Sequence, residues 1–174
     1  MKKFVKIFVA ALVLNTAALS AQGHEEHGEH AGHEGHNHHL SVFLGMTSIP
    51  ASSVNGFTVG ADYEYRLPFA NRLLGIGVLA DFAFPTDTTM TVLAGFIGIH
   101  PFEGLKLLVA PGYEMVTVTT AHGSHSHSGF MLRGSVGYDI MFGSFSVTPI
   151  VSVDYVLDTK AVAYVYGIAA GIGF

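Results

Sequence analysis

The feature that most constrains the fold is the stretch Val162–Phe174, in which bulky apolar residues alternate with mostly glycine and alanine. A β-strand sends successive side chains to opposite faces, whereas a helix would mix the two sets on its surface. We therefore predict a strand whose large side chains face an apolar environment. The bulky set is Val162, Tyr164, Tyr166, Ile168, Ala170, Ile172 and Phe174.

The same alternation extends over residues 40–174, and breaks rich in Pro, Gly, Asn, Asp and Ser interrupt it. Such breaks are typical of turns between antiparallel strands. No stretch after residue 21 has convincing helical periodicity. The predicted strands are Leu40–Ser48, Gly56–Leu67, Leu73–Phe84, Thr89–His100, Leu105–Thr119, Gly129–Phe142, Phe145–Val156 and Val162–Phe174.

The position of the charges distinguishes two kinds of barrel. Within Gly56–Leu67 the charged residues share a face with glycine and threonine, and the bulky residues occupy the other face. Only 12% of the chain is charged, against about 25% in soluble proteins. A soluble, lipocalin-like barrel would need a well-charged exterior. The sequence therefore predicts an all-β fold: an eight-stranded antiparallel up-and-down transmembrane β-barrel, with charges in a narrow lumen. Thr89–His100 alternates poorly, so its faces are not assigned.

The first 39 residues are expected to lie outside the barrel. Residues 1–21 combine Lys2, Lys3 and Lys6 with a short apolar run and small residues near Ala21, as in a secretory signal peptide. A membrane anchor is the alternative, but the run is shorter than the ~20 residues that a spanning helix needs. Residues 22–39, rich in His and Glu, cannot build a core and are predicted to be disordered.

The signal peptide, the eight alternating strands and the terminal Phe174 together resemble the small outer-membrane β-barrel proteins of Gram-negative bacteria, of the OmpA-barrel and OmpX kind. The resemblance covers Leu40–Phe174 and implies outer-membrane lipid as surroundings, with both termini in the periplasm. It also implies that the insertion machinery reads the C-terminal strand ending in Phe174. The longest external loop would then be Ala121–Ser128. This family has no shared active site.

Hairpin registers predict which lumen charges meet. A two-residue loop at Gly143–Ser144 places Arg133 opposite Asp154. A turn centred on Gly123–Ser124 would place Glu114 opposite Arg133. We therefore expect a structural layer of three charges across the lumen, because buried charges need partners. Lys106 and Asp139 are expected to form a second pair; the alternative is solvated lumen charges that never touch.

Histidines form two groups with metal-ligand chemistry. Imidazole binds zinc, copper and nickel, and the tail glutamates add oxygen ligands. We predict loose capture of zinc, with copper or nickel as alternatives. His100, near a periplasmic turn, could approach the tail. The predicted ligands are His24, His27, His30, His33, His36, His38 and His39 in the tail, and His122, His125 and His127 in the loop.

The predicted function is therefore capture or buffering of divalent transition metal by an outer-membrane barrel. The alternative is a small structural or stress-related, porin-like barrel whose tail is incidental or pH-responsive. Side chains fill an eight-stranded interior, which argues against a wide pore. His125, Ser126 and Ser128 supply only the residue types of a hydrolase, so we expect no enzyme. Residues 22–174 have five basic residues against 13 acidic ones, which argues against nucleic-acid binding.

Overall fold

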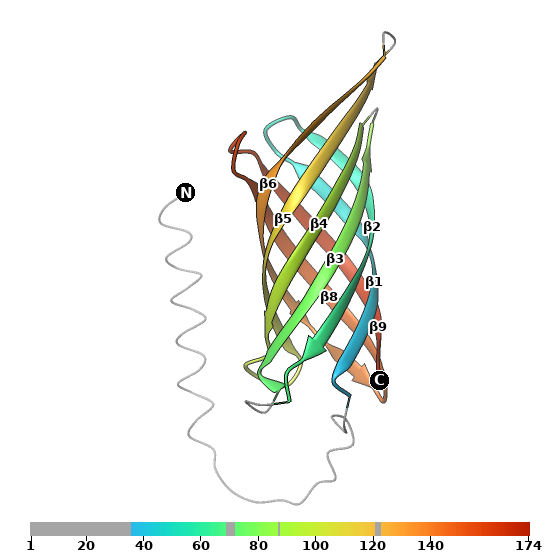
Figure 1. The fold of residues 1–174 in the computed structure, drawn as a ribbon. Helices are drawn as coiled ribbons and strands as arrows, with labels where there is room; N and C mark the ends of the chain where they lie inside the picture. Colours follow the sequence, from blue (N-terminus) through green and yellow to red (C-terminus); the bar gives the residue numbers. More distant parts are fainter. Residues whose placement is uncertain (1–35, 69–71, 87, 121–122) are drawn as a thin grey trace, which may run out of the picture. The chain divides into compact units, whose positions relative to one another are not determined.

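The computed structural model describes residues 36–68, 72–86, 88–120 and 123–174, which form a closed antiparallel β-barrel (Figure 1). Its strands are β1 (His38–Ile49), β2 (Val54–Arg66), β3 (Leu74–Pro85), β4 (Thr88–Ile99), β5 (Leu105–Thr120), β6 (Gly123–Tyr138), β7 (Ile140–Phe142), β8 (Phe145–Val156) and β9 (Val162–Gly173). Strands that follow one another pair with each other, except β6 and β7, and β1 pairs with β9. Because β6 and β7 both pair with β8, they form one barrel strand broken at Asp139. The described barrel thus has the eight strands that were predicted.

The pairing of β1 with β9 closes the barrel, and the end at which His38 and Phe174 meet is here called the terminal end. The His38 N–H donates to the Phe174 carbonyl at 3.1 Å, and the Phe174 N–H donates to the His38 carbonyl at 3.0 Å. Their rings stack with centroids 5.5 Å apart. The prediction that His38 and His39 belong to a disordered tail is therefore wrong, because pairing with the last strand brings them into β1. The predicted signal peptide and residues 22–35 lie outside the described residues.

The opposite end, here called the hairpin end, is formed by β5 and β6, which project beyond the other strands (Figure 1). Each has 16 residues, and their pairing continues to Thr120 opposite Gly123. The predicted loop Ala121–Ser128 is therefore wrong from Gly123 onwards. Glycine and serine predict a turn by local preference, but pairing with the β-branched residues of β5 gives these backbone groups partners.

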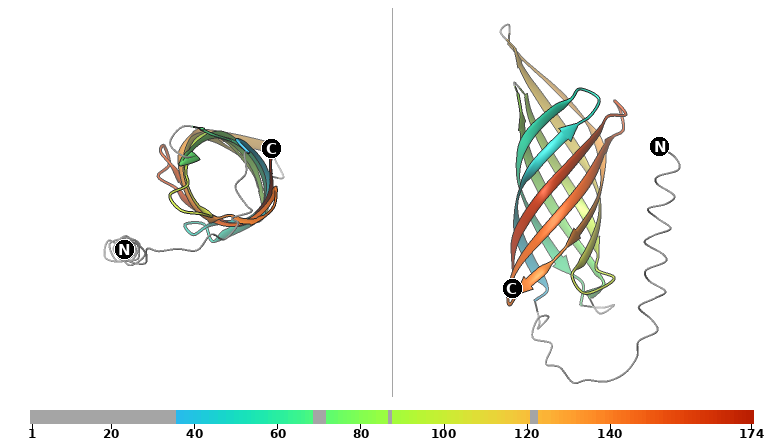
Figure 2. Two further views of the ribbon diagram at one scale, coloured as in Figure 1. Left: turned by 90° about the horizontal axis from the view of Figure 1, so that it is seen from below. Right: turned by 180° about the vertical axis from the view of Figure 1, so that it is seen from behind.

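The side chains alternate strictly between an apolar exterior and the lumen, as the period of two predicts. Figure 2 shows the barrel along its axis. In β4 both faces are apolar, which explains why its sequence does not alternate. Within the described residues, no helix is long and apolar enough to cross a membrane. The inward residues of β4 are Met90, Val92, Ala94 and Phe96, and the most exposed outward residues include Val78, Ile97, Phe130, Phe142, Phe145 and Phe174.

Candidate functional site

The first group of lumen charges, here called the central cluster, consists of Arg133, Asp154 and Asp81. Arg133 on β6 donates from Nε to Asp154 Oδ1 at 2.7 Å and from Nη2 to Asp154 Oδ2 at 2.8 Å. The two residues are direct cross-strand partners, so the predicted pair is confirmed. Arg133 Nη1 donates to Asp81 on β3, across the lumen. The two parallel hydrogen bonds to Asp154 fix the orientation of the guanidinium, and the carboxylate charge balances its positive charge.

Glu114 does not take the predicted place in this cluster. The β5–β6 register pairs Glu114 with Gly129 and Arg133 with Ala110, because Gly123 is already part of β6, opposite Thr120. The shift keeps Glu114 on the inward face, where it is buried. Asp81, which was not singled out from the sequence, is the residue that contacts Arg133 from the other side of the lumen. The alternation of side chains along β3 places Asp81 on the inward face, and this pattern could have identified it as a lumen charge.

The second group, here called the terminal cluster, lies nearer the terminal end and is centred on Glu64. Lys106 Nζ lies 2.9 Å from Glu64 Oε2 and 3.7 Å from Asp62 Oδ1. His100 Nε2 lies 2.7 Å from Glu64 Oε1, so His100 points into the lumen instead of towards the tail. Glu64 is 0% exposed, and its partners are Lys106 on β5 and His100, which directly follows β4.

Asp139, the predicted partner of Lys106, pairs with Arg66 instead. Arg66 Nη2 donates to Asp139 Oδ2 at 3.0 Å, and Thr148 Oγ1 donates to Asp139 Oδ1 at 2.7 Å. The prediction of a Lys106–Asp139 pair is wrong, because Glu64 on β2 is nearer to Lys106. The parity rule placed all these charges inside, but only barrel closure decides which of them meet.

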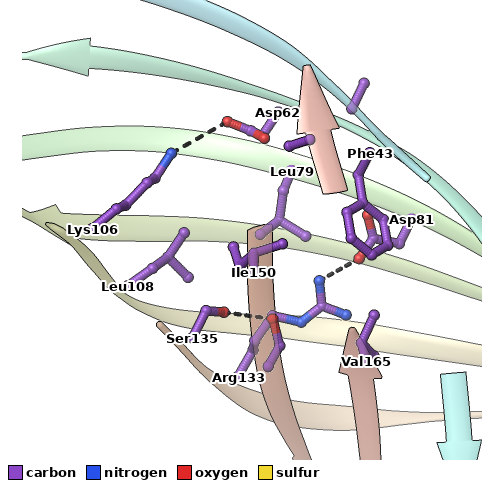
Figure 3. A pocket seen from close by; sticks show the side chains of 13 residues that line it. Phe43, Asp62, Leu79, Asp81, Lys106, Leu108, Arg133, Ser135, Ile150 and Val165 are labelled. Atoms are coloured by element: carbon purple, nitrogen blue, oxygen red, sulfur yellow. Dashed lines mark hydrogen bonds and ion pairs between the residues drawn. The ribbon is translucent and has the colours of Figure 1, made fainter. Parts of the chain in front are cut away.

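Apolar side chains separate the two clusters. A cavity of about 40 Å³ lies between them (Figure 3), with room for a few water molecules. Phe43, Leu79, Leu108 and Ile150 contribute to its wall, together with Lys106 and Arg133 at the two charged ends. The lumen is filled by side chains along this stretch, as expected for eight strands. Within the described residues, this stretch of the lumen therefore holds paired charges and a small cavity.

The predicted metal ligands of the tail and the loop differ in where they lie and in what they contact. His24, His27, His30, His33 and His122 lie outside the described residues. His38 Nδ1 is hydrogen-bonded to the Tyr63 hydroxyl at 2.6 Å. His39 Nε2 is hydrogen-bonded to the Ser146 hydroxyl inside the lumen at 2.9 Å. His38 and His39 are therefore structural members of the barrel. His36 lies at its terminal end, with Nε2 3.4 Å from Ser144 Oγ.

His125 and His127 remain together on the β5–β6 hairpin. They are two positions apart on β6 and opposite Val118 and Val116, so both imidazoles are on the same face of the ribbon. Both are exposed. In the part of the chain that the structure describes, no three His, Cys, Asp or Glu side chains are grouped closely enough to hold a metal ion.

The serines of this hairpin are not arranged around a histidine. Ser126 and Ser128 occupy the face opposite to His125 and His127, since the strand alternates. Tyr113 donates its hydroxyl hydrogen to Ser128 Oγ at 2.7 Å, and Ser126 Oγ lies 3.1 Å from the Thr117 hydroxyl. These residues form cross-strand contacts between β5 and β6.

No protein-family model matches the chain, and no curated protein matches its sequence. Among solved structures, Neisserial surface protein A is similar with a TM-score of 0.60 and 10% identity, over 79% of this chain and 96% of that one. The N-terminal β-barrel domain of Pseudomonas aeruginosa OprF is similar with a TM-score of 0.56 and 17% identity, over 81% and 100%. The chain thus has the fold of the small eight-stranded outer-membrane β-barrels, as the sequence resemblance predicted.

Proposed function

We propose that this chain spans the bacterial outer membrane and captures divalent transition metal, with zinc as the first candidate and copper or nickel as alternatives. The membrane setting is supported by the apolar exterior and by aromatic rings near both ends of it, as in interfacial belts. Phe142, Phe145 and Phe174 lie at the terminal end, and Phe84 and Tyr164 lie towards the hairpin end. On this proposal the tail extends into the periplasm and the hairpin lies outside.

The observation that carries metal capture is the exposed pair His125 and His127 on one face of the projecting hairpin. Side chains two positions apart on a strand start about 7 Å apart, a spacing that lets two imidazoles approach one ion. Two ligands leave a zinc ion with open positions, since it usually takes four. The tail histidines, which repeat every third residue from His24 to His36, offer further ligands in the periplasm.

Calorimetry with Zn²⁺ on the refolded mature protein tests this function. We expect saturable binding at pH 7.5 that is lost at pH 5, because protonated imidazole cannot bind metal. Replacing the tail ligands should remove most of the Zn²⁺ binding. The double variant His125→Ser with His127→Ser should remove a separate Zn²⁺-binding event at the hairpin. Ser124→Ala with Ser126→Ala, on the opposite face of the same hairpin, is the matched control. The tail ligands replaced by serine are His24, His27, His30, His33 and His36, leaving His38 and His39 intact.

Binding that is unchanged at pH 5, or that survives both sets of histidine substitutions, would exclude the mechanism. Absence of binding in the unaltered protein would favour the alternative of a small structural barrel, whose support is the closed, charge-paired lumen. The proposed partners are outer-membrane lipid and the insertion machinery, with Phe174 as the recognised residue. Unchanged insertion of a Phe174→Ala chain in cells would exclude that recognition.

A further inference from the structure

The terminal end contains a small pocket with chemistry unlike that of a metal site. It is here called the mouth pocket, and its volume is about 30 Å³. Two arginines are among its lining residues, Arg66 at the end of β2 and Arg72 in the following connection. The complete lining is His36, His38, His39, Arg66, Arg72, Met141 and Gly173.

Some of the buried polar atoms that lack a hydrogen-bond partner in the described part of the chain lie at this pocket. Of the five such atoms, His39 Nδ1 and Arg66 Nε belong to residues that line it, and Asn37 Oδ1 belongs to a neighbour of Arg66. The other two, Asp62 Oδ1 and Glu64 Oε2, lie beside Lys106 in the terminal cluster. His39 is only 5% exposed, and its other ring nitrogen is held by Ser146 at 2.9 Å. Asn37 and Arg66 are adjacent, since the Arg66 N–H donates to the Asn37 carbonyl at 2.7 Å. Buried polar atoms normally have a partner, so this grouping points to a ligand.

The donors fix the class of that ligand. Arg66 Nε–H can only donate, and the guanidinium stays charged. Its Nη2 is held by Asp139 at 3.0 Å, which leaves the Nε edge for another acceptor. Asp139 is itself satisfied, because Thr148 donates to its second oxygen at 2.7 Å. Two arginines at the pocket disfavour a metal cation, and guanidinium groups bind the oxygens of phosphate with charge-assisted hydrogen bonds.

We propose that the mouth pocket binds a phosphate-type oxyanion through Arg66 Nε, Arg72 and His39 Nδ1. The volume of about 30 Å³ has room for about two oxygen-sized atoms, so the rest of the bound group stays outside. His39 takes part in the form that carries hydrogen on Nδ1, with Nε2 accepting from the Ser146 hydroxyl. The phosphate could belong to a membrane phospholipid headgroup at this end of the barrel or be free inorganic phosphate. This inference is independent of metal capture.

Nuclear magnetic resonance of the arginine Nε–H groups tests the site, with the protein in micelles of a phosphate-free, non-ionic detergent. Inorganic phosphate added at constant ionic strength should shift the Arg66 Nε–H signal saturably. Arg72→Gln should weaken this binding by about tenfold, as expected for a lost charge-assisted contact. Arg66→Lys keeps the charge beside Asp139 but removes the Nε donor, and should abolish the signal and weaken binding. Lys160→Gln, in a connection at the hairpin end, is the matched control.

A second arm distinguishes the sources of the phosphate. Phosphatidylglycerol is added to the same micelles, and diacylglycerol, which lacks the phosphate, is the comparison. A shift of Arg66 Nε–H with the phospholipid but not with diacylglycerol supports a lipid headgroup, and a shift with inorganic phosphate alone supports the free ion. The proposal fails if neither phosphate source gives a saturable shift, or if Arg72→Gln leaves the affinity unchanged, because the pocket would then hold water only.

Discussion

At the scale of single residues, the central cluster shows how buried charges hold this barrel together. Arg133 links β6 to its neighbour β8 through Asp154 and to β3 across the lumen through Asp81. All three residues are buried. A buried ion pair contributes less than its contacts suggest, but removing one partner leaves a charge with no compensation. The arginine is therefore the residue in this cluster whose loss should matter most.

We expect Arg133→Met to destabilise the folded barrel by about 3–5 kcal/mol, because Asp81 and Asp154 would face each other without a cation. Urea-induced unfolding in detergent micelles measures this. Adding Asp81→Asn and Asp154→Asn to the arginine variant should restore most of the stability. Lys160→Met, at an exposed position, is the control and should change stability by less than about 0.5 kcal/mol. An arginine variant as stable as the unaltered protein would contradict the structural role of the cluster.

At the scale of elements, the register of the β5–β6 hairpin decides the position of its functional groups. A turn at Gly123–Ser124 would have brought Glu114 beside Arg133. The observed register instead places Glu114 opposite Gly129 and pairs Thr117 with Ser126. Because the shift is an even number of residues, it leaves every side chain on its predicted face. Parity alone could not have distinguished the two registers.

Disulfide trapping tests this register in a chain that has no cysteine of its own. Thr117→Cys with Ser126→Cys should cross-link on oxidation, since the two positions are direct partners and their hydroxyl oxygens lie 3.1 Å apart. Thr117→Cys with Phe130→Cys, which are partners in the alternative register, should remain reduced. Non-reducing electrophoresis and mass spectrometry detect the cross-link. Cross-linking of the second pair alone would show that the alternative register is correct.

At the scale of the whole molecule, the barrel presents two ends with different chemistry. The terminal end has the mouth pocket with Arg66 and Arg72, and the hairpin end has the exposed His125 and His127. Between them the paired charges and apolar residues close the lumen. The proposed orientation therefore assigns the arginines to the periplasm and the hairpin histidines to the outside.

Epitope tags test this orientation in cells. A tag inserted between Thr120 and Gly123 should be reached by antibody on intact cells, because β5 and β6 project beyond the other strands (Figure 1). A tag placed near Gly23 should be reached only after the outer membrane is opened. A tag on a known periplasmic protein controls for membrane integrity. The reverse pattern of labelling would overturn the orientation, and with it the proposed location of the tail.

The sequence by itself determined the strands and their faces, because side-chain direction in a strand depends only on the local period of two. The alternation and the turn breaks over residues 40–174, with the low charge content, were sufficient to predict the eight-stranded barrel with charges inside. Only the tertiary structure decided that Asp81 forms an ion pair with Arg133 and that Glu64 forms one with Lys106. These contacts depend on hairpin register and on closure of the sheet, which bring together residues distant in sequence. Closure also places His38 and His39 in β1, where local composition had predicted disorder.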